Sequence, residues 1–363
     1  MQKSGVMELR KLYKKKGDCS IKHIAYGYIN ASGEVLCMKR ERFLSMNDEV
    51  QFKYLDIIRK GMAGSIGKNI ETIDMGDGDH KKALLSMIDS DLGNSEILSG
   101  FYQQIAEHYP ECENILVILL TNTYDIPMRG QDGMKNVEAS DEVYDFLQGI
   151  ICPVALEEPG LSYSEENNEF EKKTTRWVAK APMGSFLYPS FEDRSADTDK
   201  ISIFSRKADD SFLDFMSSVF EITCQTGYAK RQETLQKVIS TAIESQENKI
   251  NAYMAIRDRM DEDDKDITGQ DMESILKDAG ADEKDIKAAL GVFERSLGTD
   301  KAGICADAAK KKDICVKNSD IAVKVKGDLA GRVSSKEIDG KRCLVIDMGF
   351  DDSVEVNGIP FQI

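Results

Sequence analysis

Apolar and polar positions follow two different periods along the chain, and the first 150 residues contain both. Residues 6–16 place apolar side chains at helical spacing among five basic residues, which predicts a short basic helix that ends at Gly17. Residues 20–30 and 34–40 alternate on either side of Ala31-Ser32-Gly33, as in a β-hairpin. The apolar spacing predicts further helices over 48–60, 80–89, 95–109 and 141–147.

The strongest strand signal is the continuous apolar run at 115–120. Such a run suits a strand that is buried on both faces, so it is the expected central strand of a sheet. TNTYDIP follows at 121–127 and places Tyr124 and Asp125 at the end of that strand, where α/β sheets often build sites. A turn stabilised by a side-chain hydrogen bond explains the same residues equally well. Further strands are expected at 69–75 and 149–156.

The segment 152–204 differs from the rest because it holds four of the seven prolines, the only tryptophan and six other aromatic residues. Proline restricts its own φ and forces the preceding residue into an extended conformation, so short strands are expected at 161–163, 176–179 and 185–188. Exposed Trp, Tyr and Arg side chains are common anchors at interfaces, which makes this segment a candidate docking surface. Alternatively, Trp177, Phe186 and Phe191 fill a core beneath irregular loops. The candidate partner-binding residues are Tyr124, Asp125, Glu157, Tyr163, Arg176, Trp177, Phe186, Phe191, Asp193, Arg194 and Asp197.

Arg194 distinguishes two arrangements of this segment. In an open site, aspartates hold Arg176 and Arg194 beside aromatic rings, and Arg194→Ala damages binding but not folding. In a structural corner, Arg194 pairs with Asp193 or Asp197, and its loss leaves an unpaired charge at a cost of several kcal/mol.

Beyond residue 208 the pattern is helical as far as residue 300 and then alternates. Residues 229–260 fit two helices or one bent helix, and Thr268 with Asp271 forms a capping box at the start of a helical hairpin. Asp339-Gly340 and Asn357-Gly358 are two-residue hairpin turns that need positive φ. The chain is therefore predicted to be an α+β protein with a basic N-terminal helix at 1–17, a mixed α/β domain at 18–207, a helical region at 208–300 and a small antiparallel β module at 301–363.

The net charge of −16 argues against nucleic-acid binding by the whole surface. Residues 1–60, however, carry 13 Lys and Arg against 7 Asp and Glu. A helix with a solvated basic face explains this excess, and so does contact with a polyanion, which makes an RNA- or ribosome-associated factor an alternative function. The candidate polyanion-binding residues are Arg10, Lys11, Lys14, Lys15, Lys16 and, in the glycine-rich segment 61–69, Lys68.

Cysteine and histidine provide little support for metal or disulfide chemistry. The eight cysteines include no CxxC pair, and the three histidines form no HExxH motif, so no metal site, cofactor or disulfide framework is expected. No apolar run reaches the length of a membrane helix, and the N-terminal residues do not resemble a secretory signal. These features predict a cytoplasmic protein.

A carboxylate- or metal-dependent hydrolase is a third possible function. It requires Asp125, Glu157, Glu158, Asp193 and Asp197 to gather with Arg194 around one cleft. The sequence contains no nucleophile elbow, metal-binding histidine set or Walker phosphate loop. The preferred prediction is therefore a non-catalytic binding or regulatory protein with a protein partner.

Several longer stretches together resemble the bacterial (Firmicutes) family called domain of unknown function 4317. They are SGVMELRKLYKKKGDCSI, AGSIGKN, TYDIP, CPVALEEPGLSYSEENNEF, RWVAKAPMGSFLYPSFEDRSADT and IDGKRCLVIDMGFDDSVEVNGI. The resemblance extends over nearly the whole chain and implies no particular activity, ligand or partner.

Overall fold

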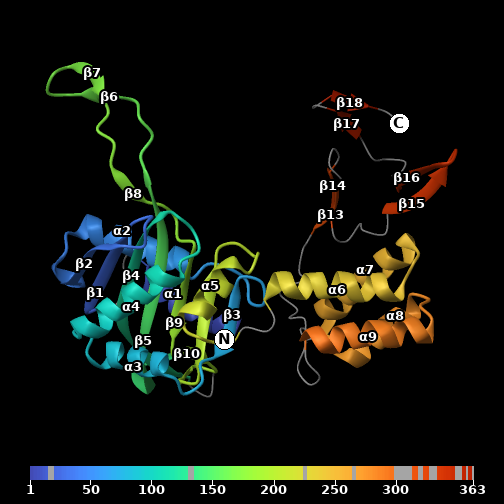
Figure 1. The fold of residues 1–363 in the computed structure, drawn as a ribbon, viewed down its shortest axis with the longest axis horizontal. Coiled ribbons are helices and arrows are strands. Elements are labelled where there is room, and N and C mark those ends of the chain that lie inside the picture. The colour runs from blue at the N-terminus through green and yellow to red at the C-terminus, as the bar shows by residue number, and fades with distance from the viewer. Residues whose placement is uncertain are drawn as a thin grey trace. The chain divides into compact units, whose positions relative to one another are not determined.

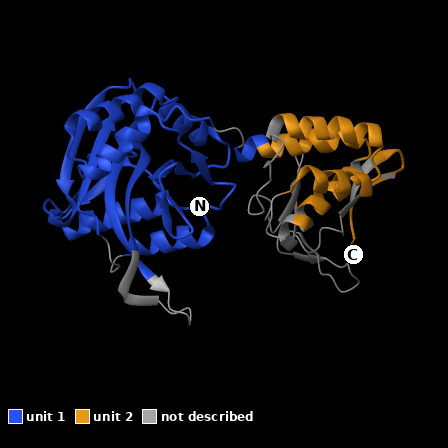
Figure 2. Cartoon of the chain, turned by 90° about the horizontal axis from the view of Figure 1, so that it is seen from below, with its two compact units in different colours: residues 1–230 blue, residues 231–363 orange. Residues whose placement is uncertain are grey.

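The structure, a computed structural model, divides into two compact units, Met1–Lys230 and Arg231–Ile363 (Figure 2). Helices and strands occur in both units, which confirms the α+β fold. The domain boundaries expected at 17/18, 207/208 and 300/301 remain predictions. The structure describes residues 1–14, 20–129, 135–223, 227–263, 267–297, 313–317, 322–326, 333–347, 354–356 and 359–361.

An antiparallel sheet forms the centre of the first unit. Strands β3 and β12 pair at one of its edges, although more than a hundred residues separate them. β8 (Trp177–Ala179) pairs with the end of β5. The strands lie in the order β2 (Val35–Arg42), β1 (His23–Ile29), β4 (Asn114–Arg129), β5 (Lys135–Leu156), β9 (Gly184–Tyr188), β12 (Lys200–Ser205) and β3 (Ile70–Asp74).

Helices cover both faces of this sheet (Figure 1). α1 (Lys3–Leu12) and α2 (Asp48–Gly61) pack on one face and share an apolar core with it. α3 (Asp79–Asp89), α4 (Ser95–His108) and α5 (Ser211–Val219) pack on the other face around a second core. None of the helices within the described residues is both long and apolar enough to cross a membrane.

The apolar run in β4 explains this three-layer arrangement. Ile118 and Leu120 belong to the core beneath α1 and α2, whereas Val117 and Leu119 belong to the core beneath α3, α4 and α5. All four side chains are fully buried. The predicted central strand, covered on both faces, is therefore confirmed.

The helix predicted at 141–147 is wrong, because these residues lie in β5. Tyr144 and Phe146 are buried, while Val143 and Asp145 are exposed. Burial therefore alternates every second residue, as in a strand, and does not follow the period of about 3.6 residues of a helix. β4 also continues beyond the apolar run, so Tyr124 and Asp125 lie within a long hairpin and not at a strand end. The spacing of Val143, Tyr144 and Leu147 fits both periods, and pairing with β4 decides between them.

Two short hairpins and a single helical turn complete the first unit. β6 (Leu161–Ser164) pairs with β7 (Glu169–Lys172), and β10 (Ser190–Glu192) pairs with β11 (Ser195–Asp197). The short helix η1 (Phe43–Ser45) follows β2.

The described part of the second unit contains helices around one apolar core. The capping box is confirmed, since the Thr268 side chain accepts from the Asp271 amide and the Asp271 side chain accepts from Thr268. Gly280, with φ of 82°, follows the end of this helix. The region 229–260 forms two helices. The helices are α6 (Tyr228–Ala242), α7 (Gln246–Asp263), α8 (Gly269–Asp278) and α9 (Glu283–Leu297).

Two-stranded hairpins follow in the C-terminal residues. Asp339 and Gly340 have φ of 51° and 74° between the paired residues Ile338 and Lys341, which confirms the predicted turn. Val356 pairs with Ile359, but 357–358 and the lysine-rich linker at 308–312 lie outside the described residues. The strand pairs are β13 (Asp313–Lys317) with β14 (Ala322–Lys326), β15 (Val333–Ile338) with β16 (Lys341–Ile346) and β17 (Val354–Val356) with β18 (Ile359–Phe361).

Candidate functional site

The segment 157–176 extends from the sheet as a two-stranded arm, with β6 and β7 at its tip (Figure 1). β5 pairs with β8 as far as Leu156 and Trp177. Beyond this pair, the Glu157 amide donates to the Arg176 carbonyl at 2.9 Å, and the Lys173 amide donates to the Gly160 carbonyl at 2.9 Å. No residue of the arm is buried or belongs to either core of the first unit.

The period of two along β6 and β7 places the apolar side chains of the tip on one face. Tyr163 lies opposite Phe170, with 5.5 Å between the ring centroids, and Leu161 is two residues from Tyr163 on the same side of its strand. Leu161 is 73% exposed, Phe170 70% and Tyr163 51%. We call these three residues the arm face. The opposite face carries Ser162, Ser164, Glu169 and Glu171.

The base of the arm adds a second apolar pair. Trp177 is 58% exposed and lies opposite Leu156, which is 48% exposed. Glu157 forms an ion pair with Lys173 at 3.4 Å, and Arg176 is exposed. The arm and its base therefore contain four of the predicted docking residues, Glu157, Tyr163, Arg176 and Trp177.

Leu161 and Phe170 are not among the docking residues predicted from the sequence, although both belong to the arm face. The signal that would have found them is the alternation along 161–164 and 169–172. The arm has a net negative charge, because residues 157–176 contain six glutamates against two lysines and one arginine.

Phe186 and Phe191 lie in the interior of the first unit. Phe186 is fully buried, with its ring centroid 5.8 Å from that of Phe101 and 5.0 Å from that of Phe220. Phe191 is 1% exposed and its ring centroid lies 4.9 Å from that of Tyr144. These two side chains fill the core and are not available to a partner.

Arg194 forms a structural corner, but with a different partner from the one expected. Asp193 and Arg194 make the turn between β10 and β11, with φ of 45° and 64°. The Arg194 guanidinium lies 3.5 Å from a carboxylate oxygen of Glu8 and donates to the Pro127 carbonyl at 2.7 Å. The Tyr124 hydroxyl donates to the same Glu8 oxygen at 2.8 Å, and burial together with this bond raises the pKa of Tyr124. The cluster ties α1 to β4 and to the β10–β11 hairpin.

We expect Arg194→Ala to lower the free energy of unfolding by about 1–3 kcal/mol, because Glu8 then loses a partly buried charged partner. Urea denaturation followed by circular dichroism measures this change. Arg176→Ala is the matched control, since Arg176 is exposed on the arm and its loss should cost under ~0.5 kcal/mol. Equal effects of the two substitutions would contradict a structural role for Arg194.

The carboxylates of the predicted hydrolase site are not brought together. Asp125 is exposed on β4, Glu157 and Glu158 lie on the arm, and Asp193 accepts from the Gln2 side-chain amide at 2.7 Å. Among the described residues, no contact joins any two of these groups, and no group of three His, Cys, Asp or Glu residues is arranged to hold a metal ion.

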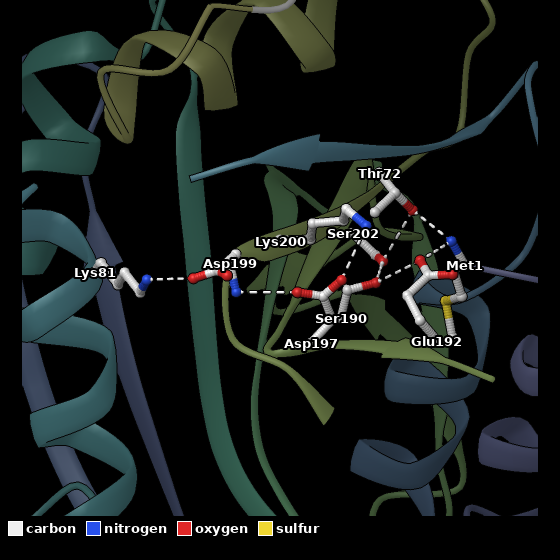
Figure 3. A network of polar contacts seen from close by, with 9 residues as sticks. All are labelled: Met1, Thr72, Lys81, Ser190, Glu192, Asp197, Asp199, Lys200 and Ser202. Carbon is white, nitrogen blue, oxygen red and sulfur yellow. Dashed lines mark hydrogen bonds and ion pairs between the residues drawn. The ribbon is translucent and has the colours of Figure 1, made fainter. Parts of the chain in front are cut away.

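Asp197 belongs instead to a chain of polar contacts between the β10–β11 hairpin and the sheet edge (Figure 3). The Lys200 ammonium forms an ion pair with the Asp197 carboxylate at 2.9 Å, and this contact lowers the pKa of Asp197. In the same network the buried hydroxyls of Ser190 and Ser202 lie 2.8 Å apart, and Ser202 is 3.3 Å from the Thr72 hydroxyl. These groups satisfy one another, so the network holds β3, β10 and β12 together.

The candidate polyanion-binding residues lie in two places. The Lys68 ammonium lies 5.7 Å from the centroid of the Tyr228 ring, a cation–π contact that gives this lysine a structural partner. Arg10 and Lys11 are in the last turn of α1 and Lys14 is exposed just beyond it, whereas Lys15 and Lys16 lie outside the described residues.

Fold and site together define an α+β protein whose sheet unit carries an exposed aromatic arm. A family model described as "Domain of unknown function (DUF4317)" matches residues 1–359, and the chain belongs to this family. No curated protein and no solved structure matches the chain.

Proposed function

We propose that this protein is a non-catalytic binding protein that docks a protein partner on its aromatic arm. The observation that carries this proposal is the arm face, where Leu161, Tyr163 and Phe170 are each more than half exposed. Contiguous exposed apolar groups of this kind characterise interaction surfaces, and aromatic side chains are frequent anchors of binding energy. The ribbon holds these anchors in a fixed register, which lowers the entropy that binding costs.

The charge around the arm face defines the chemistry of the partner. The arm, residues 157–176, carries six glutamates against Lys172, Lys173 and Arg176, so its net charge is negative. An acidic surface attracts a basic one and repels phosphate groups, so the arm suits a protein with an apolar groove and a rim of lysine or arginine, and does not suit RNA.

The test is a double substitution, Tyr163→Ser with Phe170→Ser. Proteins retained by the wild-type chain are identified, purified and titrated against each variant. Each aromatic anchor is worth about 2 kcal/mol, so the double variant, which removes two anchors, should bind roughly a thousandfold more weakly. The melting temperature should stay unchanged, because the arm face packs on neither core.

Ser162→Ala with Ser164→Ala is the matched control, since it alters the opposite face of the same ribbon. The proposal is contradicted if the control weakens binding as much as the double variant, if no retained protein binds in titration, or if the arm mediates only self-association. Binding by the wild type should weaken as salt is raised, in line with a basic partner.

A further inference from the structure

A cavity of about 410 Å³ lies at one end of the sheet of the first unit, and none of the arm residues 157–176 lines it. Three connecting segments converge on it, namely 109–113 before β4, 181–183 before β9 and 206–211 before α5. Convergent loops on a rigid scaffold are a common setting for ligand sites, and the volume falls in the range of small-molecule pockets.

Part of the cavity wall is aromatic and apolar. Tyr109, Met183, Phe212 and Phe215 line it, and the rings of Tyr109 and Phe215 meet edge to face with 5.5 Å between their centroids. The Tyr109 hydroxyl is buried and has no hydrogen-bond partner in the described structure. A ligand with an apolar body and a polar group fits such a wall.

Exposed side chains of both charges line the same cavity. Glu111 and Glu113 come from the segment before β4, and Arg206 and Lys207 come from the segment before α5. Within the described part of the chain, no ion pair joins Glu111, Glu113 or Arg206 to any residue. Both carboxylates act on Tyr109, where burial and then their charges raise the pKa of the hydroxyl.

We propose that this cavity binds a short hydrophobic peptide with free termini, of about dipeptide size. The peptide carboxylate pairs with the guanidinium of Arg206, and the peptide ammonium pairs with the carboxylates of Glu111 and Glu113. The peptide side chains pack against Phe212 and Phe215. The lining carries this assignment because a simple anion leaves the two glutamates unmatched, and a simple cation leaves Arg206 unmatched. The cavity lining does not include the arm face, and the inference does not rest on the proposed function.

Isothermal titration of the full chain with L-leucyl-L-phenylalanine tests the proposal. Its N-acetyl derivative lacks the ammonium group, and its C-terminal amide lacks the carboxylate. Each derivative should bind at least about tenfold more weakly than the free dipeptide, because one charge-assisted contact is lost. Arg206→Ala should weaken binding of the free dipeptide by a similar factor. It should leave the affinity for the C-terminal amide unchanged, because the amide has no carboxylate for Arg206 to bind. The double variant Glu111→Gln with Glu113→Gln should weaken binding of the free dipeptide. It should leave the affinity for the N-acetyl derivative unchanged, because that derivative has no ammonium group.

Lys53→Ala is the control variant, since Lys53 is exposed on α2 and does not line the cavity. Melting curves of all variants show whether each is folded before titration. Absence of dipeptide binding to the folded wild type overturns the proposal. So does a blocked derivative that binds as tightly as the free dipeptide, and so does normal dipeptide binding by folded Arg206→Ala.

Discussion

Phe186→Ala is expected to lower the free energy of unfolding by about 3–5 kcal/mol, the usual cost of removing a buried phenylalanine ring. The ring is fully buried between the sheet and the helices that cover it, in contact with Phe101 and Phe220. The surrounding groups belong to several elements of one packed core, so they cannot collapse fully into the space that the substitution leaves. Equilibrium urea denaturation measures the effect.

Trp177→Ala is the matched comparison, because it also removes an aromatic ring from the segment 152–204. Trp177 is 58% exposed, and its loss should change the free energy of unfolding by under ~0.5 kcal/mol. A loss of several kcal/mol for Trp177→Ala would place that side chain in a core and remove it from the docking surface. A negligible loss for Phe186→Ala would contradict the packing of the sheet.

Leu9→Ala is expected to lower the free energy of unfolding by about 2–5 kcal/mol. Leu9 is fully buried, and its neighbours on the same side of α1, Val6 and Leu12, belong to the same core as the sheet residues Ile118 and Leu120. The N-terminal helix therefore contributes to folding through its apolar side.

Lys11→Glu and Lys14→Glu separate the charge of this segment from its packing. Both lysines are exposed, so each reversal should cost under ~0.5 kcal/mol of stability. If either reversal destabilises the protein as much as Leu9→Ala, the lysine takes part in a structural ion pair. Denaturation curves of the three variants under the same conditions decide between these outcomes.

Local patterns in the sequence predict the elements that short-range chemistry determines. The apolar run at 115–120, the capping box at Thr268 and the turn at Asp339-Gly340 each rest on residues within a few positions of one another, and each is confirmed. The region 141–147 is different, because its apolar residues fit two periods. Pairing with β4 over the whole length of the hairpin fixes it as a strand.

The candidate site required information that the sequence does not contain locally. Phe186 and Phe170 are both aromatic residues in short strands of the same segment, yet one is in a core and the other is on the arm face. The difference arises because helices cover the sheet on both faces and do not cover the arm. Arg194 pairs with Glu8, 186 positions earlier, and no local spacing indicates that contact.

The pairing of β3 with β12 has a consequence for the order in which the chain can fold during translation. Residues 70–74 leave the ribosome long before residues 200–205, their partners in the ladder. The core beneath α3 and α4 also needs residues of α5 and extends to Ile222. A nascent chain shorter than this leaves the side of β4 that faces α3 and α4 only partly covered, and such long-range pairing slows folding. Association of the unfinished chain with a chaperone would protect it over that interval.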